Sequence, residues 1–505
     1  MKKKFYITTP LYYVNASPHI GHSYTNIACD VIARYMRQVI GKDKVWFLTG
    51  TDEHGQKIQK AAQAEGLAPI AFVDKTVLQF KALWEKLNIS FDDFIRTTES
   101  RHGQFVQAAL RILYAKGEIY KDTYEGLYCT PCENFWLQQQ APDNLCPDCK
   151  RPLERILEEN YFFNLSKHQP WLMEYIRKNP GFIKPESRRN EVMSFLELNT
   201  LAPLCISRPK ERLEWGIPLP FSSDHVTYVW FDALLNYTSA VGSFDKNDAY
   251  VSEWWPADLQ LIGKDILRHH AIYWPIMLHA LGIELPQTVF AHGWWMINED
   301  KMSKSKGNAV NPLDMVNTFG IDVYRYFLMR DVPFGLDGNF SEDAIIKRFN
   351  SDLANDLGNL VYRTLTMVEK YFSGNVPVAD SSLKEGFAES IREKMLHLGE
   401  GISGAIGVES NYNFSQALER IWEVINLANK YVEETKPWNL AKENKEKELK
   451  AFIRLLVDVI RVVSDALLPF MPATAAAIQA QVGTDRIAKG NPLFPRIDTK
   501  LPKKN

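Results

Sequence analysis

Long uncharged apolar runs are absent from this chain of 505 residues. The most apolar C-terminal stretch, residues 452–471, contains four charged side chains, so it does not match a membrane-spanning helix. Three lysines precede a short apolar stretch at the start, but prolines interrupt it and no small-residue cleavage site follows. We therefore expect no membrane segment and no secretory leader, and we take the cytoplasm as the compartment.

An excess of one charge is also missing. The chain has 59 lysines and arginines against 61 aspartates and glutamates, which excludes a chain-wide polycation. A nucleic-acid partner would therefore have to be bound through local patches and shape. Hydrophobic residues make up 46% of the chain, enough for buried cores, and its length predicts roughly two to four domains.

Two familiar nucleotide-binding fingerprints are missing. There is no Gly-x-Gly-x-x-Gly, and the turn Gly50–Gly55 has the glycine spacing of a P-loop without its lysine and hydroxyl pair. Strand-like residues 4–9 and 45–48 each precede a turn and a helical pattern, which predicts a parallel α/β sheet with ligands at the carboxyl ends of its strands. In the turn that follows strand-like residues 45–48, Asp52 could hold a substrate ammonium group or cap the next helix.

The pattern changes along the chain. A region rich in cysteine, proline and aromatic residues interrupts the α/β rhythm, which returns with strand-like residues 226–231 and 259–263. After Ser341 the periodicity is helical, and we expect the proline- and lysine-rich tail to fold back or fray. We predict five parts: residues 1–116 and 217–289 as two halves of an α/β domain, 117–216 as an insertion, 290–345 as a connecting region and 346–505 as a helical domain.

Two histidines flank a glycine near the start, in His19-Ile20-Gly21-His22. Ser17-Pro18 predicts a helix start here, with Ser17 as the N-cap, and the unpaired N–H groups of a helix N-terminus favour phosphate. Gly21 would let a ligand approach the backbone closely. Two other interpretations stay open: zinc ligation by the imidazoles, or a plain helix start with solvated histidines.

A second motif, Lys301-Met302-Ser303-Lys304-Ser305, places two lysines on a hydroxyl-rich loop. Such a loop can close over a triphosphate and stabilise the charge that builds on departing pyrophosphate. A solvated surface loop is the alternative. Because the loop follows the aromatic residues 290–296, we expect it to overhang an interior.

Cysteine is scarce, and four of the six cysteines form one cluster. The pairs Cys129-x2-Cys132 and Cys146-x2-Cys149 match a tetrahedral zinc site with every position filled, which is structural rather than catalytic. Disulfides are the alternative, and a reducing compartment disfavours them.

In the helical region, Asn355, Asn359 and Arg363 fall four residues apart on one predicted face, and Trp438 follows a proline. Amide edges and a flat indole are suited to reading and stacking single-stranded bases. The alternative is asparagines bonded across a helix interface and a tryptophan in the core.

From end to end, the chain resembles class I methionyl-tRNA synthetases: His19–His22 is similar to their "HIGH" element and Lys301–Ser305 to their "KMSKS" element. The resemblance implies a Rossmann-like parallel-sheet α/β catalytic domain, a zinc-bearing connective insertion and a C-terminal helical-bundle domain. It implies that L-methionine and ATP form methionyl-adenylate and pyrophosphate, and that methionine then passes to the terminal ribose of tRNA-Met. It further implies two metal ions, one structural Zn²⁺ and Mg²⁺ bound with ATP, and a tRNA partner with a CAU anticodon. No sequence resembles the appended dimerisation domain of some relatives, so we expect a monomer.

The resemblance also implies roles for single residues. The catalytic residues would be His19, His22, Lys301 and Lys304. ATP would be bound by His19, Gly21, His22, Gly263, Asp265, His292, Lys301, Ser303 and Lys304. Methionine would be bound by Leu11, Tyr13, Asp52, Arg208, Trp230, Ala233, Leu234, Tyr237, Ile266, His270 and Trp274. The anticodon would be read by Asn355, Asn359, Arg363 and Trp438, and zinc held by Cys129, Cys132, Cys146 and Cys149. One departure is His269, which stands where the family leads us to expect phenylalanine.

Two alternatives remain open. A synthetase for leucine, isoleucine, valine or cysteine would share both motifs, but the modest insertion argues against the first three, which need a large editing domain because a methylene is discriminated by only about 1–3 kcal/mol. A catalytically idle RNA-binding protein is the other, and the intact histidines and lysines disfavour it.

Overall fold

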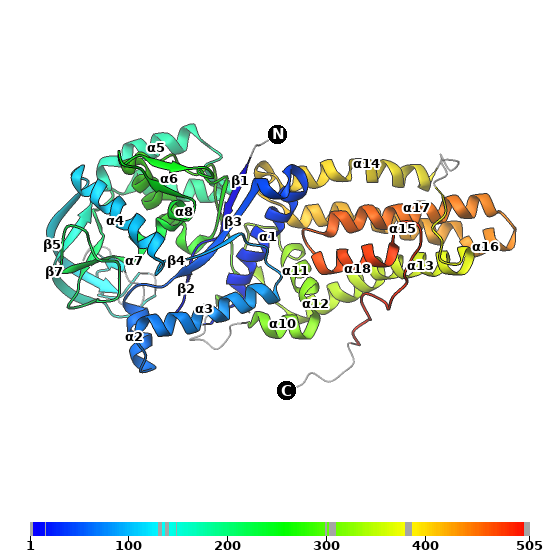
Figure 1. Ribbon diagram of the computed structural model, residues 1–505, viewed down its shortest axis with the longest axis horizontal. Helices are drawn as coiled ribbons and strands as arrows, with labels where there is room; N and C mark the ends of the chain where they lie inside the picture. The colour runs from blue at the N-terminus through cyan, green and yellow to red at the C-terminus, as the bar shows by residue number, and fades with distance from the viewer. Residues whose placement is uncertain are drawn as a thin grey trace. The chain divides into compact units, whose positions relative to one another are not determined.

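The computed structural model describes residues 4–15, 17–129, 134–136, 141–147, 149–297, 300–301, 310–378 and 386–498. The chain divides into two compact units: Met1–Glu85 with Ile89–His292, and Lys86–Asn88 with Gly293–Asn505. Figure 1 shows a sheet covered by helices in the first unit and a set of long helices in the second. Within the described ranges, no helix is both long and apolar enough to span a bilayer.

A parallel sheet forms the centre of the first unit, as the sequence predicts. Its strands run in the order β2 (Tyr12–Tyr13), β3 (Val45–Asp52), β1 (Phe5–Thr8), β14 (Leu259–Gly263), β15 (Val289–His292) and β8 (Ile183–Lys184), and β4 (Asp93–Arg96) pairs with β3. Every residue of β1 and β15 is buried, which is typical of parallel strands covered by helices on both faces. The carboxyl ends of β1, β3, β14 and β15 therefore share one edge.

Helix α1 (Ile20–Ile40) follows β1, and its buried residues include Ile27 and Val31 at helical spacing. It ends at Gly41, whose φ of +104° suits glycine. The predicted N-cap, Ser17, is wrong: the cap is His19, because its ring nitrogen accepts the Gly21 N–H. The remaining helices of this unit are α2 (Gln56–Ala64), α3 (Pro69–Lys86), α4 (Ser100–Ala115), α5 (Gln169–Lys178), α6 (Glu186–Leu198), α7 (Val229–Leu234), α8 (Asn236–Ser239) and α9 (Trp274–Leu281).

Four strands within residues 117–216 form a second, antiparallel sheet. It consists of β5 (Ile119–Cys129), β6 (Asn134–Trp136), β7 (Glu154–Phe163) and β9 (Leu204–Cys205). The same stretch also supplies β8 to the central sheet. The predicted strand at 226–231 is wrong in part: β11 (His225–Thr227) pairs with β10 (Ser207–Pro209), and α7 takes over at Val229. A further hairpin joins β12 (Gly242–Phe244) to β13 (Tyr250–Ser252).

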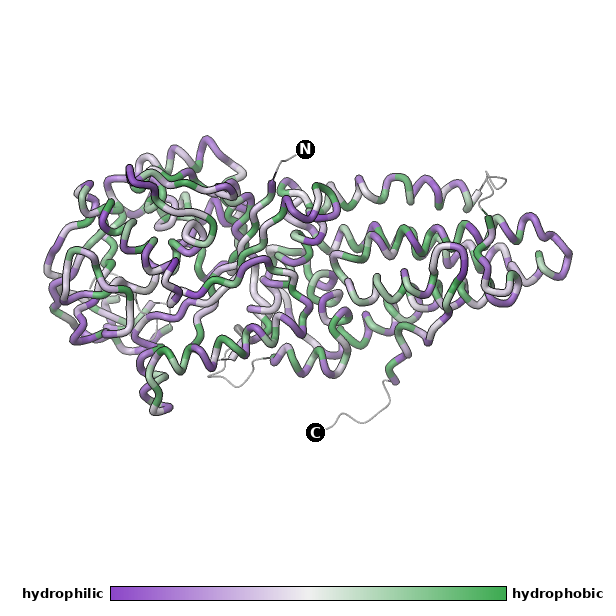
Figure 2. Tube along the Cα trace, in the orientation of Figure 1, coloured by the Kyte–Doolittle hydropathy of each residue, from purple (hydrophilic) through white to green (hydrophobic). Residues whose placement is uncertain are grey.

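The second unit is mainly helical. A small sheet consists of β16 (Trp295–Ile297), β17 (Asp300–Lys301) and β18 (Gly338–Asn339). A π-helical segment, Phe349–Gly358, leads directly into α13 (Asn359–Phe372). The other α-helices are α10 (Pro312–Phe319), α11 (Ile321–Arg330), α12 (Glu342–Arg348), α14 (Phe387–Ile406), α15 (Phe414–Thr435), α16 (Pro437–Lys442), α17 (Glu446–Leu467) and α18 (Pro472–Val482). Hydrophobic and hydrophilic residues alternate along these helices (Figure 2), which buries one side of each. The tail returns onto this unit: the Asn350 side chain bonds both the N–H and the carbonyl of Ile497.

Candidate active site

The two histidines of the first motif lie at the start of α1 with their rings stacked, 3.9 Å between centroids. Nδ1 of His19 accepts the Gly21 N–H at 3.1 Å, and Nδ1 of His22 accepts the His19 N–H at 3.2 Å. Because both Nδ1 atoms accept, a neutral ring carries its proton on Nε2. A Cβ at Gly21 would lie 3.0 Å from Cε1 of His19, so the glycine makes room for the ring. In neutral rings, both Nε2–H groups would therefore lie at the start of α1.

The ends of β14 and β15 meet next to α1. Gly263 is in register with His292, and a Cβ at Gly263 would lie 2.6 Å from a carboxylate oxygen of Asp265. The Thr25 hydroxyl of α1 lies 2.7 Å from Nε2 of His292, whose ring also packs edge-on against Tyr24. Three predicted nucleotide contacts, Gly263, Asp265 and His292, are therefore neighbours at the carboxyl edge of the sheet.

Three buried side chains that are predicted to bind methionine, Tyr237, His270 and Trp274, lie close together. The Tyr237 hydroxyl lies 2.8 Å from Nε2 of His270, and the Trp274 indole donates to Gln260 at 3.0 Å. Ala233 and Leu234 of α7 are buried, and Ile266, Leu11, Tyr13 and Trp230 are half-buried. Trp230 stacks on His269, 3.9 Å between centroids. The unexpected histidine is thus a direct neighbour of a predicted pocket residue.

Asp52 is the last residue of β3 and is 5% exposed. The alternative role as a helix cap is wrong, because α2 begins at Gln56 with Gly55 at its N-cap position. The carboxylate of Asp52 contributes to raising the pKa of Tyr237, after the larger effect of burial, which places the two side chains near each other.

Arg208 is buried against other groups. Its guanidinium lies over the rings of Tyr228 and Tyr128, and it donates to the Ser207 carbonyl at 2.6 Å. Together with Gly55, Arg208 and the two tyrosines line a small cavity.

The lysine-rich motif falls almost entirely outside the described residues. The backbone of Lys301 lies in β17, whereas its side chain and residues 302–309, with Ser303 and Lys304, are not described. The convergence of the two motifs around one triphosphate therefore stays a prediction.

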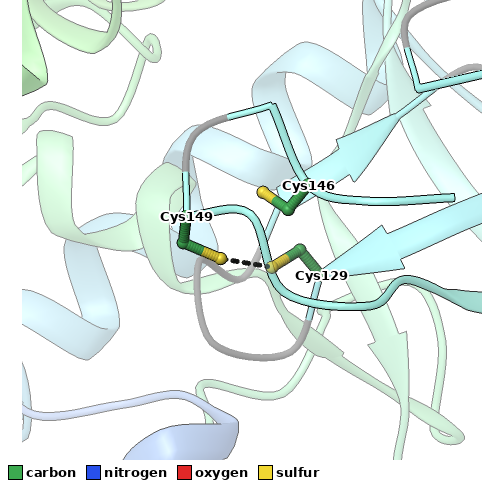
Figure 3. A group of neighbouring side chains, drawn as sticks. All are labelled: Cys129, Cys146 and Cys149. Carbon is green, nitrogen blue, oxygen red and sulfur yellow. Dashed lines mark hydrogen bonds between the residues drawn. The ribbon is translucent and has the colours of Figure 1, made fainter. Parts of the chain in front are cut away.

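Three of the four predicted zinc ligands lie together (Figure 3). The sulfurs of Cys129, Cys146 and Cys149 are within 4.8 Å of one another, and those of Cys129 and Cys149 are 3.5 Å apart. A disulfide would need about 2.0 Å. Sulfurs about 2.3 Å from a tetrahedral zinc would be about 3.8 Å apart, so the donor set and its spacing fit zinc. Cys132 lies outside the described residues.

The second unit carries a groove of about 520 Å³ beside the π-helical segment and α13. Asn355 and Asn359 line it together with Tyr362, Phe494 and Arg496. Both asparagines are exposed, so they do not bond across a buried interface. Arg363 lies one turn further along α13, and Trp438 of α16 is 43% exposed, so it is not a core residue.

Comparison with known proteins decides the family. A model described as "tRNA synthetases class I (M)" matches residues 5–365, and an "Anticodon-binding domain of tRNA ligase" matches residues 406–503. The methionine–tRNA ligase of Clostridium perfringens is 47% identical over 99% of this chain and 79% of its own length, and that of Thermotoga maritima is 44% identical over 98% and 81%. The chain belongs to the class I methionine–tRNA ligases. A solved methionyl-tRNA synthetase of Mycobacterium tuberculosis, in complex with methionyl-adenylate, has a TM-score of 0.91 at 39% identity and covers 98% of this chain and 100% of its own.

Membership in the methionine–tRNA ligases confirms the predicted fold class and the enzymatic function, in which methionine is activated with ATP and transferred to tRNA. It decides against the synthetases for other amino acids and against an idle RNA-binding protein. The roles of individual site residues stay predictions.

Sequence reasoning missed two long-range pairs in this chain, one buried and one half-buried. His54 and Asp232 join the turn after β3 to α7, with Nδ1 2.9 Å from a carboxylate oxygen. Glu53 forms a bidentate pair with Arg96 at 2.7 and 2.9 Å. The only available signal was the cluster of acids and a histidine in Asp52-Glu53-His54, because the partners lie far away in the sequence.

Proposed function

We propose that the carboxyl edge of the central sheet binds methionine and ATP side by side and joins them as methionyl-adenylate. The relative from M. tuberculosis, solved with methionyl-adenylate, is similar over 98% of this chain, which supports the proposal. In this assignment the catalytic domain comprises residues 1–116 and 217–289, with the insertion at 117–216, the connecting region at 290–345 and the anticodon domain at 346–505.

On the methionine side, Tyr237, His270 and Trp274 would enclose the thioether, for which aromatic walls and polarizable contacts are favourable. Leu11, Tyr13, Trp230, Ala233, Leu234 and Ile266 would complete the walls. The carboxylate of Asp52 would hold the ammonium group and Arg208 the carboxylate end of the amino acid. The burial of Asp52 and its place at the end of β3 support this orientation.

On the ATP side, the Nε2–H groups of His19 and His22 would donate to the triphosphate at the start of α1, with Gly21 leaving space. Gly263, Asp265 and His292 would hold the ribose and base, and Mg²⁺ would arrive bound to ATP. Lys301, Ser303 and Lys304 would close from the other side and neutralise charge on the pyrophosphate as it leaves.

The chemistry then needs little beyond positioning and charge stabilisation. An oxygen of the methionine carboxylate attacks the α-phosphorus, and the bond to the β-phosphate oxygen breaks to release pyrophosphate. The 2′-hydroxyl of the terminal tRNA ribose then attacks the carbonyl carbon of the adenylate, loses its proton, and AMP leaves.

The second unit would bind tRNA-Met by its CAU anticodon, through Asn355, Asn359, Arg363 and Trp438. The exposed groove beside the π-helical segment supports this, as does the match to an anticodon-binding domain. We also propose one structural Zn²⁺ held by Cys129, Cys132, Cys146 and Cys149. Among the described residues no cysteine forms a disulfide, which supports the cytoplasm as the compartment. We also propose a monomer.

The observation that carries the proposal is the neighbourhood of Gly263, Asp265, His292 and the stacked histidines at one sheet edge. Amino-acid-dependent ATP–pyrophosphate exchange tests it with a panel of amino acids. We expect methionine alone to support rapid exchange, and His19→Asn to reduce the rate with little change in the KM for methionine. Exchange that responds equally to isoleucine or leucine contradicts the pocket assignment, and an unchanged rate in His19→Asn contradicts the role of the motif.

A further inference from the structure

One buried pair connects the two sides of the proposed amino-acid pocket. His54 lies two residues after Asp52, and Asp232 lies on α7 between Trp230 and Ala233. Nδ1 of His54 donates to the Asp232 carboxylate at 2.9 Å, and the two residues are 6% and 0% exposed. The pair therefore bridges the strand end that carries the proposed ammonium ligand and the helix that carries the proposed thioether contacts.

Hydrogen bonds to the neighbouring residue, Glu53, also hold the turn that carries His54. The Glu53 carboxylate accepts two bonds from Arg96 and one each from the hydroxyls of Thr51 and Thr98. The Glu53 carbonyl accepts the Trp215 indole N–H at 2.5 Å. Because residues 52–55 are held on this side, the bond from His54 transmits their position to α7.

Packing alone does not require this pair. The Asp232 carboxylate is fully buried, which raises the pKa of this group, and a buried polar or charged pair is often no more stable than apolar residues of similar volume. What the pair supplies and apolar residues do not is a directional bond of fixed length between two elements.

We propose that the His54–Asp232 pair is a positioning device that sets the separation of Asp52 from the Trp230–Leu234 wall, and so selects the length of the amino-acid side chain. This rests on the proposed function, which places methionine between these two elements. Neither residue contacts the substrate in this account, and both act through the pocket residues beside them.

The test compares three variants with a matched control by ATP–pyrophosphate exchange. Asp232→Ala removes the bond, Asp232→Asn retains an oxygen acceptor for His54, and the double variant His54→Leu with Asp232→Leu removes both partners without leaving an unpaired buried group. The control is Glu118→Gln, because Glu118 forms a buried pair with His168, at 3.0 Å, accepts a second bond from Lys167, and is not among the proposed pocket residues. Methionine and ethionine, which is one methylene longer, are the substrates.

We expect Asp232→Ala to raise the KM for methionine by about 10- to 100-fold, by analogy with the loss of a residue that supports a metal ligand, with the KM for ATP changed by less than about twofold. The preference for methionine over ethionine should fall at least about fivefold. Asp232→Asn should stay within about threefold of wild type. The double leucine variant should match wild type in thermal unfolding and still show the raised KM and lost preference, whereas Glu118→Gln should show neither.

A double leucine variant with wild-type KM and wild-type preference overturns the inference, as does a parallel rise in the KM values for methionine and ATP. Failure of the proposed function is recognised separately: wild-type enzyme would then show no methionine-dependent exchange, or Asp52→Asn would leave the KM for methionine unchanged.

Discussion

The hydroxyl of Tyr237 lies 2.8 Å from Nε2 of His270, and both side chains are buried. Nδ1 of His270 lies 3.0 Å from the carbonyl oxygen of Ile266, which can only accept a hydrogen bond. Nδ1 therefore carries the proton, and Nε2 accepts the proton of the Tyr237 hydroxyl. Burial lowers the pKa of His270 to about 4, so this arrangement is uncharged at neutral pH. This pair therefore contributes polar atoms but no charge to the proposed thioether side of the pocket.

Replacing Tyr237 by phenylalanine leaves Nε2 of His270 buried without its donor. We expect the free energy of unfolding to fall by about 1–3 kcal/mol and the KM for methionine to rise several-fold. Denaturant unfolding and ATP–pyrophosphate exchange measure the two effects. Tyr326→Phe is the matched control, because its hydroxyl donates to Asp352 at 2.8 Å in the other unit; it should lose stability and keep the KM for methionine. An unchanged KM in Tyr237→Phe would remove this hydroxyl from the pocket.

Three buried or half-buried histidines predict acid sensitivity. Burial lowers the pKa values of His102 and His269 to about 3 and that of His270 to about 4, against about 6.5 in an unfolded chain. Below pH 6.5 the unfolded chain therefore binds protons that the folded chain does not, and stability falls as pH falls, until the folded histidines protonate near pH 3–4. Each histidine should contribute a slope of up to about 1.4 kcal/mol per pH unit.

The variant His269→Phe isolates one of these contributions. Unfolding free energies measured by urea denaturation between pH 7 and 4.5 should show a shallower slope than in wild type, with the difference reaching up to about 1.4 kcal/mol per pH unit at the acid end. Tyr273→Phe is the control. Tyr273 packs edge-on against His269, and its replacement removes no group that titrates between pH 4.5 and 7. Equal slopes in wild type and His269→Phe would mean that the pKa of His269 is the same in the folded and unfolded chains.

Sequence patterns predicted those strands and helix ends that depend mainly on residues adjacent in the chain. The apolar run 259–263 is β14, and the glycine at position 41 ends α1, because its positive φ suits a residue without a side chain. The N-cap was placed at Ser17 because serine is a common cap, and the sequence does not show that an imidazole nitrogen of His19 would accept the Gly21 N–H instead.

Long-range pairs could not be predicted from patterns. His54 and Asp232 are 178 residues apart, and no pattern near either residue in the sequence indicates its partner. The strand predicted at 226–231 failed for a related reason: these residues are apolar and β-branched or aromatic, but their burial against neighbouring elements is satisfied by a short strand followed by α7. A contiguous motif such as His19–His22 can be recognised in the sequence, whereas a pair that the fold brings together, such as His54 and Asp232, cannot.

The Thr25 hydroxyl, 2.7 Å from Nε2 of His292, predicts a defect specific to ATP. Thr25→Val keeps the side-chain volume and removes the hydroxyl, so the His292 ring loses a fixed partner beside Gly263 and Asp265. We expect the KM for ATP to rise by about 5- to 10-fold, equivalent to a hydrogen bond of about 1 kcal/mol or slightly more, with the KM for methionine unchanged. Thr25→Ser should restore it. A Val variant with the wild-type KM for ATP would show that the Thr25 hydroxyl is not needed to hold His292 for ATP binding.

The cysteine cluster predicts one bound zinc per chain. Cys146→Ser should reduce the zinc content, measured by elemental analysis of the purified protein, from about one equivalent to well below it, because a tetrahedral structural site needs all four ligands. Cys205→Ser is the control: Cys205 is also buried but lies outside the cluster, so zinc should be retained. Zinc retained in full by Cys146→Ser would show that the metal, if bound, does not depend on this sulfur.

Trp438 predicts a defect confined to tRNA. Its ring is 43% exposed on α16, and a base stacked on an aromatic face contributes about 1–3 kcal/mol, so Trp438→Ala should raise the KM for tRNA by about 5- to 150-fold in aminoacylation. ATP–pyrophosphate exchange, which needs no tRNA, should keep its wild-type rate, and Trp438→Phe should recover part of the affinity because it keeps a flat face. Leu396→Ala, at a position 77% exposed on α14, is the surface control. If Trp438→Ala aminoacylates with the wild-type KM, the exposed indole does not stack on the anticodon; if exchange falls as well, the side chain supports the fold rather than the contact.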